Sequence, residues 1–278
     1  MMEWDKIEVF GKSKVQHGKL SDRVYLMKLN EEDMPGIIKM LECLVKDNAY
    51  SKIFAKVPEK RRHDFENFEF QQEAHIPNFF KGREDGFFMS KFFNGRDVLS
   101  SPQKIDAIIQ LAKEKSGTAH FFKEDFKYEI RKAIPEDVGQ MCSVFKKVFD
   151  SYPFPIFDPE YISSTMSDNI DYYVACEKGQ IISISSAEID KEQKNAEMTD
   201  FATLPPYRSQ GIAQRLLQNM EKNLVVKGVL VAYTIARALS AGMNITFAKH
   251  HYQFGGTLVN NTNISGKIES MNVWYKLL

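Results

Sequence analysis

A strand, a turn and a helix are predicted in succession between residues 196 and 227, and their junction has the features of an anion-binding site. The strand-like run 196–203 ends at Leu204-Pro205-Pro206, and the pattern Arg208-x-x-Gly211-x-Ala213 follows at once. An amphipathic helix comes next. Its apolar residues recur every four positions at Ile212, Leu216, Met220 and Leu224, and Gly228 stands where a helix-ending glycine belongs.

The start of this helix offers donors to a negatively charged ligand. The first N–H groups of a helix have no partner within it, and the helix dipole favours negative charge there. Gly211 lets the backbone approach a ligand closely, and Arg208 adds a fork of donors to a phosphate. The six-residue pattern alone is more typical of an ordinary helix start with a surface arginine. The strands on either side of it favour the anion site.

Two carboxylates lie on the predicted strand that leads into the turn. A carboxylate such as Glu197 in a partly apolar cleft has a raised pKa and can take a proton from an ammonium group. The alternative is a glutamate on the surface edge of the strand. Asp200 lies in the middle of the strand, where an unpaired charge is costly. It therefore binds a cationic group or is satisfied by local backbone donors, and we favour substrate contact. Strict alternation would put the two carboxylates on opposite faces.

Composition excludes several classes of function. The 278 residues suit one large or two modest domains. Lysine plus arginine equals aspartate plus glutamate, 37 each, so net charge gives no argument for a nucleic acid or membrane partner. Cys43, Cys142 and Cys176 are widely spaced and read as reduced core residues. With neither a signal peptide nor an uncharged run of membrane-spanning length, we expect a cytoplasmic protein.

The chain divides near residue 125 into two predicted domains, 1–125 and 126–278. From residue 127 the patterns predict the order β-α-β-β-β-α-β-α-β-β, which indicates a mixed α/β sheet. Lys178-Gly179 marks a hairpin within it, and the place of a second helix near residues 159–166 is open. In the first domain, strands are predicted near residues 51–57 and 86–93. A helix with Ser101 as N-cap and Pro102 at its first position ends at Gly117.

The strand–loop–helix unit of residues 197–213 resembles the acetyl-CoA loop of the GNAT N-acetyltransferases, whose pattern is Gln/Arg-x-x-Gly-x-Gly/Ala. The resemblance implies the GNAT acyl-CoA N-acyltransferase fold for residues 126–278. In that fold two central strands splay apart after the loop, and the pantetheine lies in the gap. The first domain resembles the C-terminal half of a GNAT unit that lacks the cofactor loop. An unrelated α/β cap is the alternative.

The resemblance also implies roles for individual residues. Glu197 stands 14 residues before Gly211, which is the spacing of the catalytic base in histone-acetylating members. GNAT strands commonly carry a bulge here, which would bring Asp200 to the same face as Glu197. Phenylalanine fills the slot of the usual tyrosine acid at Phe247, which puts tyrosine acid catalysis in doubt. The residues implied for acetyl-CoA are Phe201, Ala202, Thr203, Arg208, Ser209, Gln210, Gly211, Ile212, Ala213, Asn244 and Phe247.

Residues 199–203 and the C-terminal third are similar to the β-lysine N6-acetyltransferase family. The similarity rests on the runs Tyr233-Thr-Ile-Ala-Arg237, Gly255-Gly-Thr-Leu-Val-Asn260-Asn261 and Glu269-Ser-Met-Asn272-Val-Trp274. The family transfers acetyl from acetyl-CoA to the ε-amine of β-lysine, which carries a carboxylate and a second amine. Arg237 is a candidate for the carboxylate. Candidates for the amines are Asn260, Asn261, Glu269 and Asn272, and turn chemistry with a surface arginine is the alternative.

The sequence thus predicts a cytoplasmic enzyme that uses acetyl-CoA as cosubstrate and no metal, with Glu197 and Asp200 as catalytic residues. The expected partner is a small amine, with neither nucleic acid nor membrane, and a homodimer is an open possibility. One alternative acceptor is a polyamine, lysine or an aminoglycoside. An alternative from a different class is a non-catalytic acyl-CoA-binding module or sensor.

Overall fold

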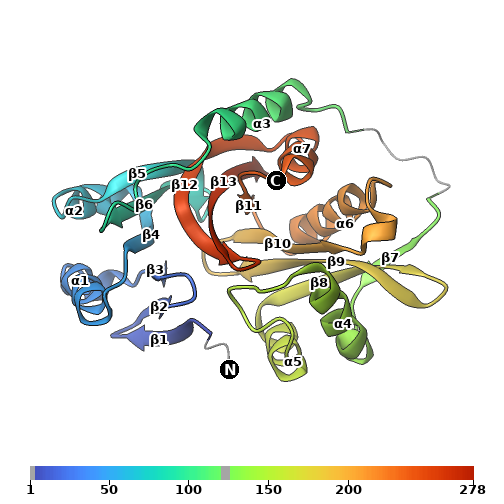
Figure 1. Cartoon of the computed structure of the whole chain (residues 1–278), viewed down its shortest axis with the longest axis horizontal. Coiled ribbons are helices and arrows are strands. Elements are labelled where there is room, and N and C mark those ends of the chain that lie inside the picture. Colours follow the sequence, from blue (N-terminus) through green and yellow to red (C-terminus); the bar gives the residue numbers. More distant parts are fainter. Residues whose placement is uncertain (1–3, 120–125) are drawn as a thin grey trace.

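The computed structural model describes residues 4–119 and 126–278 of the chain. The strands of these residues form one sheet in the order β1-β2-β3-β4-β6-β5-β12-β13-β11-β10-β9-β8-β7. Figure 1 shows the first six strands at one side of the molecule and the last seven at the other. The two groups meet where β5 and β12 pair, at Ala74 and Gly256.

The first half contains strands β1 (Lys6–Phe10), β2 (Ser13–Gly18), β3 (Arg23–Lys28), β4 (Lys52–Pro58), β5 (Gln71–Phe80) and β6 (Glu84–Phe92). Its helices are α1 (Gly36–Asn48), α2 (Arg62–Glu66) and α3 (Pro102–Glu114). Short 3₁₀ turns occur at Glu31–Asp33 (η1) and Glu59–Arg61 (η2). The sequence predictions named β4, β6 and α3 but none of the first three strands.

The second half contains strands β7 (Glu129–Lys132), β8 (Ile170–Glu177), β9 (Gln180–Asp190), β10 (Asn195–Thr203), β11 (Val231–Arg237), β12 (Gln253–Ile264) and β13 (Lys267–Leu277). Its helices are α4 (Val138–Val148), α5 (Pro159–Asp168), α6 (Ile212–Val226) and α7 (Ala241–Lys249). Short 3₁₀ turns occur at Pro135–Asp137 (η3) and Pro205–Tyr207 (η4). This order agrees with the predicted one, and α5 is the second helix whose place was open.

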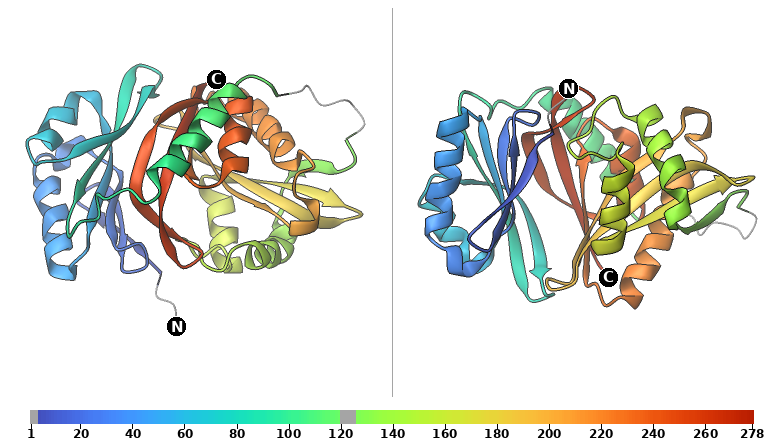
Figure 2. Two further views of the ribbon diagram at one scale, coloured as in Figure 1. Left: turned by 45° about the horizontal axis from the view of Figure 1, so that its top comes forward. Right: turned by 90° about the horizontal axis from the view of Figure 1, so that it is seen from below.

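Helices cover both faces of the second half, as Figures 1 and 2 show. On β8, Tyr172 and Val174 point into a core with α4 and α5, whereas Tyr173 and Ala175 point into the core with α6. A strand buried on both faces needs apolar side chains at every position, which explains its unbroken apolar run. Lys178 and Gly179 both have positive φ, as expected for the tight hairpin turn between β8 and β9.

The two halves share a topology when each is followed outward from the β5–β12 junction. In each half an antiparallel hairpin (β5–β6 or β12–β13) comes first, and a pair of parallel strands (β4–β3 or β11–β10) comes next. A helix, α1 or α6, connects the two parallel strands in each case. Whether the first half is a GNAT-like unit or an unrelated cap stays a prediction. The domain boundary near residue 125 stays a prediction.

Several local predictions need correction. Ser101 has a left-handed backbone and makes no side-chain cap to α3, although α3 does begin at Pro102. Helix α3 packs along α7 of the second half. Cys43 is exposed on α1, whereas Cys142 and Cys176 are buried. No helix of the described residues is long and apolar enough to cross a membrane.

Candidate active site

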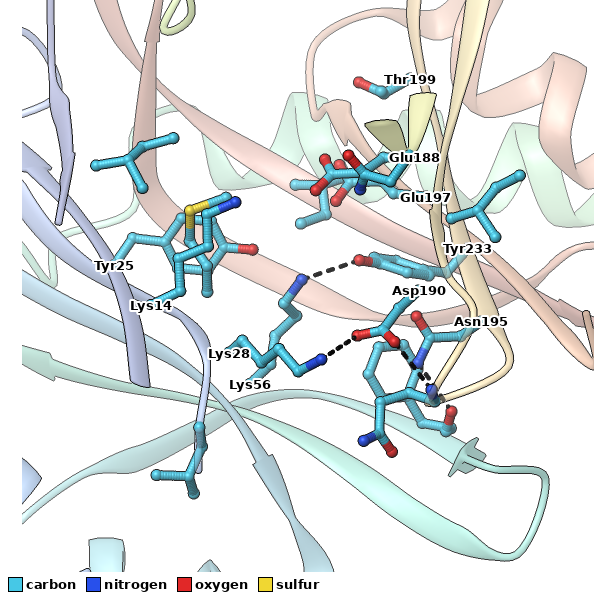
Figure 3. Close-up of a pocket in the computed structure, with 18 of the residues that line it drawn as sticks. Lys14, Tyr25, Lys28, Lys56, Glu188, Asp190, Asn195, Glu197, Thr199 and Tyr233 are labelled. Atoms are coloured by element: carbon cyan, nitrogen blue, oxygen red, sulfur yellow. Dashed lines mark hydrogen bonds and ion pairs between the residues drawn. The ribbon is translucent and has the colours of Figure 1, made fainter. Parts of the chain in front are cut away.

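A cavity of about 1080 Å³ lies between the two halves of the sheet. Its walls come from β2, β3 and β4 of the first half, and from β9, β10 and β11 of the second. Figure 3 shows side chains from the two halves facing one another across it. The strands that supply these walls are far apart in the sequence and meet only in the folded sheet.

Strands β10 and β11 separate beside this cavity. Their parallel pairing covers only residues 195–197 of β10 and 231–233 of β11, and it ends at Glu197 and Tyr233. β10 continues to pair with β9 as far as Thr203, so the backbone edge of β10 that faces β11 is left without a strand partner beyond Glu197. Backbone groups on such an edge can pair with an extended amide-containing ligand. This is the splay that the GNAT resemblance implies.

Glu197 points into the cavity where the two strands separate, and its side chain is half-buried. Burial raises the pKa of this carboxyl to about 7, and the neighbouring Glu188 carboxylate adds to the rise, while Lys56 and Tyr233 oppose it. Glu188 lies directly opposite Glu197 in the β9–β10 register. A carboxyl with a pKa near neutrality can accept and release a proton under ordinary conditions.

Asp200 follows at a bulge in β10, where the pairing register shifts between Thr199 and Ala202. Its φ of +54° is a left-handed conformation that aspartate tolerates better than most residues. The bulge brings Asp200 into the cavity lining together with Glu197, as the resemblance implied. The carboxylate accepts hydrogen bonds from the hydroxyls of Tyr152 at 2.6 Å and Ser186 at 2.5 Å. Side-chain hydroxyls therefore satisfy Asp200, in place of the local backbone donors that were one of the two alternatives, and the favoured substrate contact stays a prediction.

The predicted anion loop joins β10 to α6 through η4. Gly211 is the N-cap of α6 with a φ of +75°, and no side chain caps the helix. The N–H groups of the first turn therefore remain available to a ligand. Arg208 and Ser209 are exposed, and the Nε of Arg208 donates to the Thr203 carbonyl at 3.1 Å. Gln210 accepts a bond from the Tyr128 hydroxyl at 2.5 Å, which ties the loop to the residue before β7.

The remaining residues implied for the cofactor have structural contacts. Ile212 and Ala202 are buried, and Ala213 is half-buried in the first turn of α6. Phe201 meets the ring of Phe247 edge-on at 5.5 Å. Asn244 is fully buried, where it donates to the carbonyls of Arg237 and Ser240 and accepts from Asn272 and Trp274. Because these bonds use the whole Asn244 amide, the structure gives it no free group for a cofactor.

The C-terminal substrate candidates are mostly bound to other protein groups. Arg237 and Glu269 form a two-bond ion pair at 2.7 and 2.5 Å. Asn260 donates to the carbonyls of Arg96 and Val98, and Asn272 accepts from Thr257. Only Asn261 of the predicted set lines the cavity. The geometry therefore does not bring these residues together as a substrate site.

Sequence reasoning missed several cavity residues. Lys56 of β4 donates to the Tyr233 hydroxyl at 3.0 Å, and Tyr25 of β3 lies beside it. Glu188 of β9 was missed as well. A signal for Lys56 existed, because a lysine interrupts the otherwise apolar strand β4. Nothing in the sequence pairs that strand with Glu197. Among the described residues, no group of three His, Cys, Asp or Glu side chains is arranged to hold a metal ion.

Comparison with known proteins places these features in a family. Residues 140–240 match the model of the "Acetyltransferase (GNAT) family". A "Beta-lysine N(6)-acetyltransferase" of Methanococcus maripaludis is 39% identical over 274 residues, which cover 98% of this chain and 99% of that protein. A protein of the same name from Methanosarcina mazei is 30% identical over 89% of this chain and 97% of its own length. "N-acetyltransferase YodP" of Bacillus subtilis is 41% identical over 54% of this chain and 55% of its own length.

Proposed function

We propose that this chain, which belongs to the β-lysine N6-acetyltransferase family of GNAT acetyltransferases, transfers an acetyl group from acetyl-CoA to the ε-amine of β-lysine. The observation that carries the proposal is the place of Glu197. It lies where β10 and β11 separate, it faces the cavity, and its pKa is raised to about 7. The near-full-length similarity to two proteins named for this reaction supports the choice of acceptor.

The chain has features that fit acetyl-CoA. The uncapped start of α6, with Gly211 in a left-handed conformation, suits the pyrophosphate. The open edge of β10 at residues 201–203 suits the pantetheine amides. Acetyl-CoA would supply the thioester that is attacked and the thiolate that leaves. The protein holds the two reactants in line, which accounts for much of the rate in such transfers.

We assign the role of general base to Glu197. An amine must lose its proton before it can attack, and a lysine-type amine is almost fully protonated near pH 7. Glu197 takes that proton directly or through a water molecule. Asp200 we assign a positioning role, because its oxygens hold the hydroxyls of Tyr152 and Ser186. Tyr152 lines the cavity and would border the acceptor.

The side chain at position 247 is not the proton donor to the thiolate, because a phenylalanine has no proton to give. Phe247 is fully buried against Phe201 and Tyr252. Replacing Phe247 with tyrosine should leave kcat within about tenfold of wild type, since general-acid contributions are ~10²–10⁴ where they operate. The melting temperature should fall, because a hydroxyl enters an apolar core. Steady-state kinetics and thermal unfolding measure both effects. A gain of several hundredfold in kcat would show instead that this slot lacks an acid the enzyme needs.

An acetyl-transfer assay over a panel of amines tests the proposal directly. Purified protein, acetyl-CoA and a thiol reagent are sufficient, with β-lysine, α-lysine, spermidine and an aminoglycoside as acceptors. We expect the highest kcat/KM with β-lysine, and mass spectrometry should place the acetyl group on its ε-nitrogen. Equal release of CoA with spermidine or α-lysine would contradict the substrate assignment. Binding of acetyl-CoA without turnover of any amine would favour an acyl-CoA-binding module.

We also propose a cytoplasmic location, which the three unpaired cysteines support. A homodimer stays a prediction.

A further inference from the structure

The cavity has two charged walls that belong to different halves of the chain. Glu188 and Glu197 of the second half are two of the carboxylates that line it, and they lie near the splayed strands. Arg23 and Lys56 of the first half carry cations on the facing strands β3 and β4. Among the described residues, neither Arg23 nor Lys56 forms an ion pair within 4 Å with Glu188 or Glu197. Lys28 of β3, by contrast, is paired with Asp190 at 3.6 Å and with Glu192 at 2.8 Å.

The two cations share one aromatic side chain. The Arg23 guanidinium lies 5.0 Å from the centre of the Tyr25 ring, and the Lys56 ammonium lies 5.5 Å from it. Tyr25 itself stacks on Phe54 at 4.8 Å, which fixes the ring on the wall of the cavity. We call Arg23, Tyr25 and Lys56 the cationic wall. β3 and β4 run parallel with Tyr25 opposite Phe54, so the wall is built on regular paired strands and not on a loop.

Neither cation of this wall has a carboxylate partner among the residues that the structure describes. Arg23 is only 4% exposed, yet its guanidinium donates to neutral oxygens alone: the Asn261 carbonyl and the Thr262 hydroxyl at 2.8 Å, and the Gln16 amide at 3.4 Å. Its Nε has no hydrogen-bond partner. The Lys56 ammonium donates to the Tyr233 hydroxyl at 3.0 Å and lies against Tyr25, and an ammonium has three protons to donate.

Two buried cations elsewhere in the first half each have a carboxylate partner. Lys52, on the same strand as Lys56, is paired with Glu73 at 2.7 Å, and Arg96 has Asp22 at 3.4 Å. A buried charge without a partner is costly, so such a group is usually paired or reserved for a ligand. Arg23 is buried and Lys56 is half-buried, and both lie beside the cavity without a carboxylate partner, which points to an anionic group of the ligand.

We propose that the cationic wall binds the carboxylate of the acceptor, so that the first half of the chain selects an amino acid over a simple diamine. This inference rests on the proposed function. The ε-amine then lies toward Glu197. In this arrangement the cationic wall takes the role that the sequence suggested for Arg237, whose guanidinium is already paired with Glu269.

A pair of acceptors isolates the carboxylate. The compound 1,4-diaminopentane keeps both amines of β-lysine and the spacing between them, and it lacks only the carboxylate. We expect wild type to have a kcat/KM for β-lysine that is at least ~100-fold higher, because a charge-assisted contact with two cations is lost from the diamine. Calorimetry with each compound, in the presence of CoA, gives the same comparison without turnover.

Removing one cation should reduce this preference. Lys56→Met keeps the apolar stem, and we expect the ratio of the two kcat/KM values to fall by roughly 30-fold, mainly through KM for β-lysine. The ratio is the readout, because any effect of Lys56 on the pKa of Glu197 acts on both acceptors alike. Lys56→Arg should restore most of the preference. Arg23→Lys keeps a buried charge but loses the fork, so it tests the second cation without leaving an empty site.

Lys28→Met is the matched control. Lys28 lies on β3 and lines the same cavity, but its ammonium is paired with Glu192 at 2.8 Å. We expect its ratio to match that of wild type. An unchanged ratio in both Lys56→Met and Arg23→Lys would overturn the inference while leaving acetyl transfer to β-lysine intact. Tight, Lys56-dependent binding of β-lysine without its acetylation would support the inference and contradict the proposed function. Equal binding of β-lysine and 1,4-diaminopentane by wild type would overturn the inference.

Discussion

Replacing Glu197 with glutamine should lower kcat/KM for β-lysine by about 10²–10⁴-fold near neutral pH, the usual range for loss of a general base. Glutamine has nearly the same shape, but it cannot take a proton from the ammonium group of the acceptor. The loss should shrink as the pH approaches the pKa of the amine, because free amine then becomes abundant without help. Kinetics from pH 6 to 10 with saturating acetyl-CoA measure both effects.

The pH profile of wild type gives an independent test. Glu197 must be ionised to act, and burial raises its pKa to about 7. The kcat/KM for β-lysine should therefore rise with pH through an apparent pKa near 7, whose exact position belongs to Glu197 and its neighbours together. Glu188→Gln should move this limb to lower pH, because the Glu188 charge contributes to the raised pKa. The Glu197→Gln variant should lack the limb.

Stability measurements separate loss of chemistry from loss of fold. The pKa of Glu197 is higher in the folded chain than the ordinary 4.5, so the folded state holds its proton more tightly. Its contribution to stability is therefore fully present below about pH 4.5 and is lost as the pH rises through 7. An uncharged glutamine avoids that loss. We expect Glu197→Gln to melt at a higher temperature than wild type at pH 8, although it is nearly inactive.

Glu192→Gln is a suitable control for this series. Glu192 also lines the cavity, but it is paired with Lys28 and does not lie near the splayed strands. Its variant should keep wild-type kinetics. If Glu197→Gln kept the wild-type rate at every pH, the carboxylate would be structural, and the proton would have to leave through water or another residue.

The elements of the second half could be predicted from the sequence because the patterns that indicate them are local. The Lys178-Gly179 turn, the four-residue spacing in α6 and the apolar run of β8 each depend on residues close in the chain. The anion loop is local as well, since Gly211 and the start of α6 follow β10 directly. Even the bulge at Asp200 agreed with the family resemblance.

The proposed acceptor side of the site could not be predicted from the sequence, because it forms only when strands from both halves pair into one sheet. Lys56 meets Tyr233 only because the first six strands extend the sheet of the second half through β5 and β12. The polar residues predicted for the substrate have protein partners for a related reason. Arg237 and Glu269 form an ion pair because β11 pairs with β13. The Asn244 amide donates to the carbonyl of Arg237 at the end of β11. Charged and amide side chains that could bind a substrate can equally bind each other, and residue type alone does not distinguish the two cases.

The first half has an acidic turn where the second half has the proposed cofactor loop. Between β3 and α1, at the place that corresponds to the anion loop, the chain carries Glu31, Glu32 and Asp33. Asp33 accepts bonds from the Lys12 backbone and the Ser13 hydroxyl. Carboxylates there would repel a pyrophosphate. In our proposal, the shared topology carries the cofactor loop in the second half and the cationic wall in the first.

The Gly211→Asp variant should lose at least ~100-fold in affinity for acetyl-CoA while remaining folded. Gly211 has a φ of +75°, which aspartate tolerates better than most residues, and aspartate is a favourable N-cap. The fold of α6 is therefore preserved, but the new carboxylate occupies the free N–H groups and places a negative charge where the pyrophosphate would bind. Calorimetry with acetyl-CoA, with circular dichroism as the check on folding, measures the effect.

Two companion variants separate charge from shape. Gly211→Asn has the size and backbone tolerance of aspartate without its charge, so its loss of affinity should be clearly smaller, and the difference should shrink in high salt. Gly228→Asp places the same residue at the other end of the same helix, where φ is +74° and a side chain has open space. It should bind acetyl-CoA as wild type does. If folded Gly211→Asp bound acetyl-CoA with unchanged affinity, the phosphates would have to lie elsewhere. The uncapped end of α6 would then be an ordinary helix start.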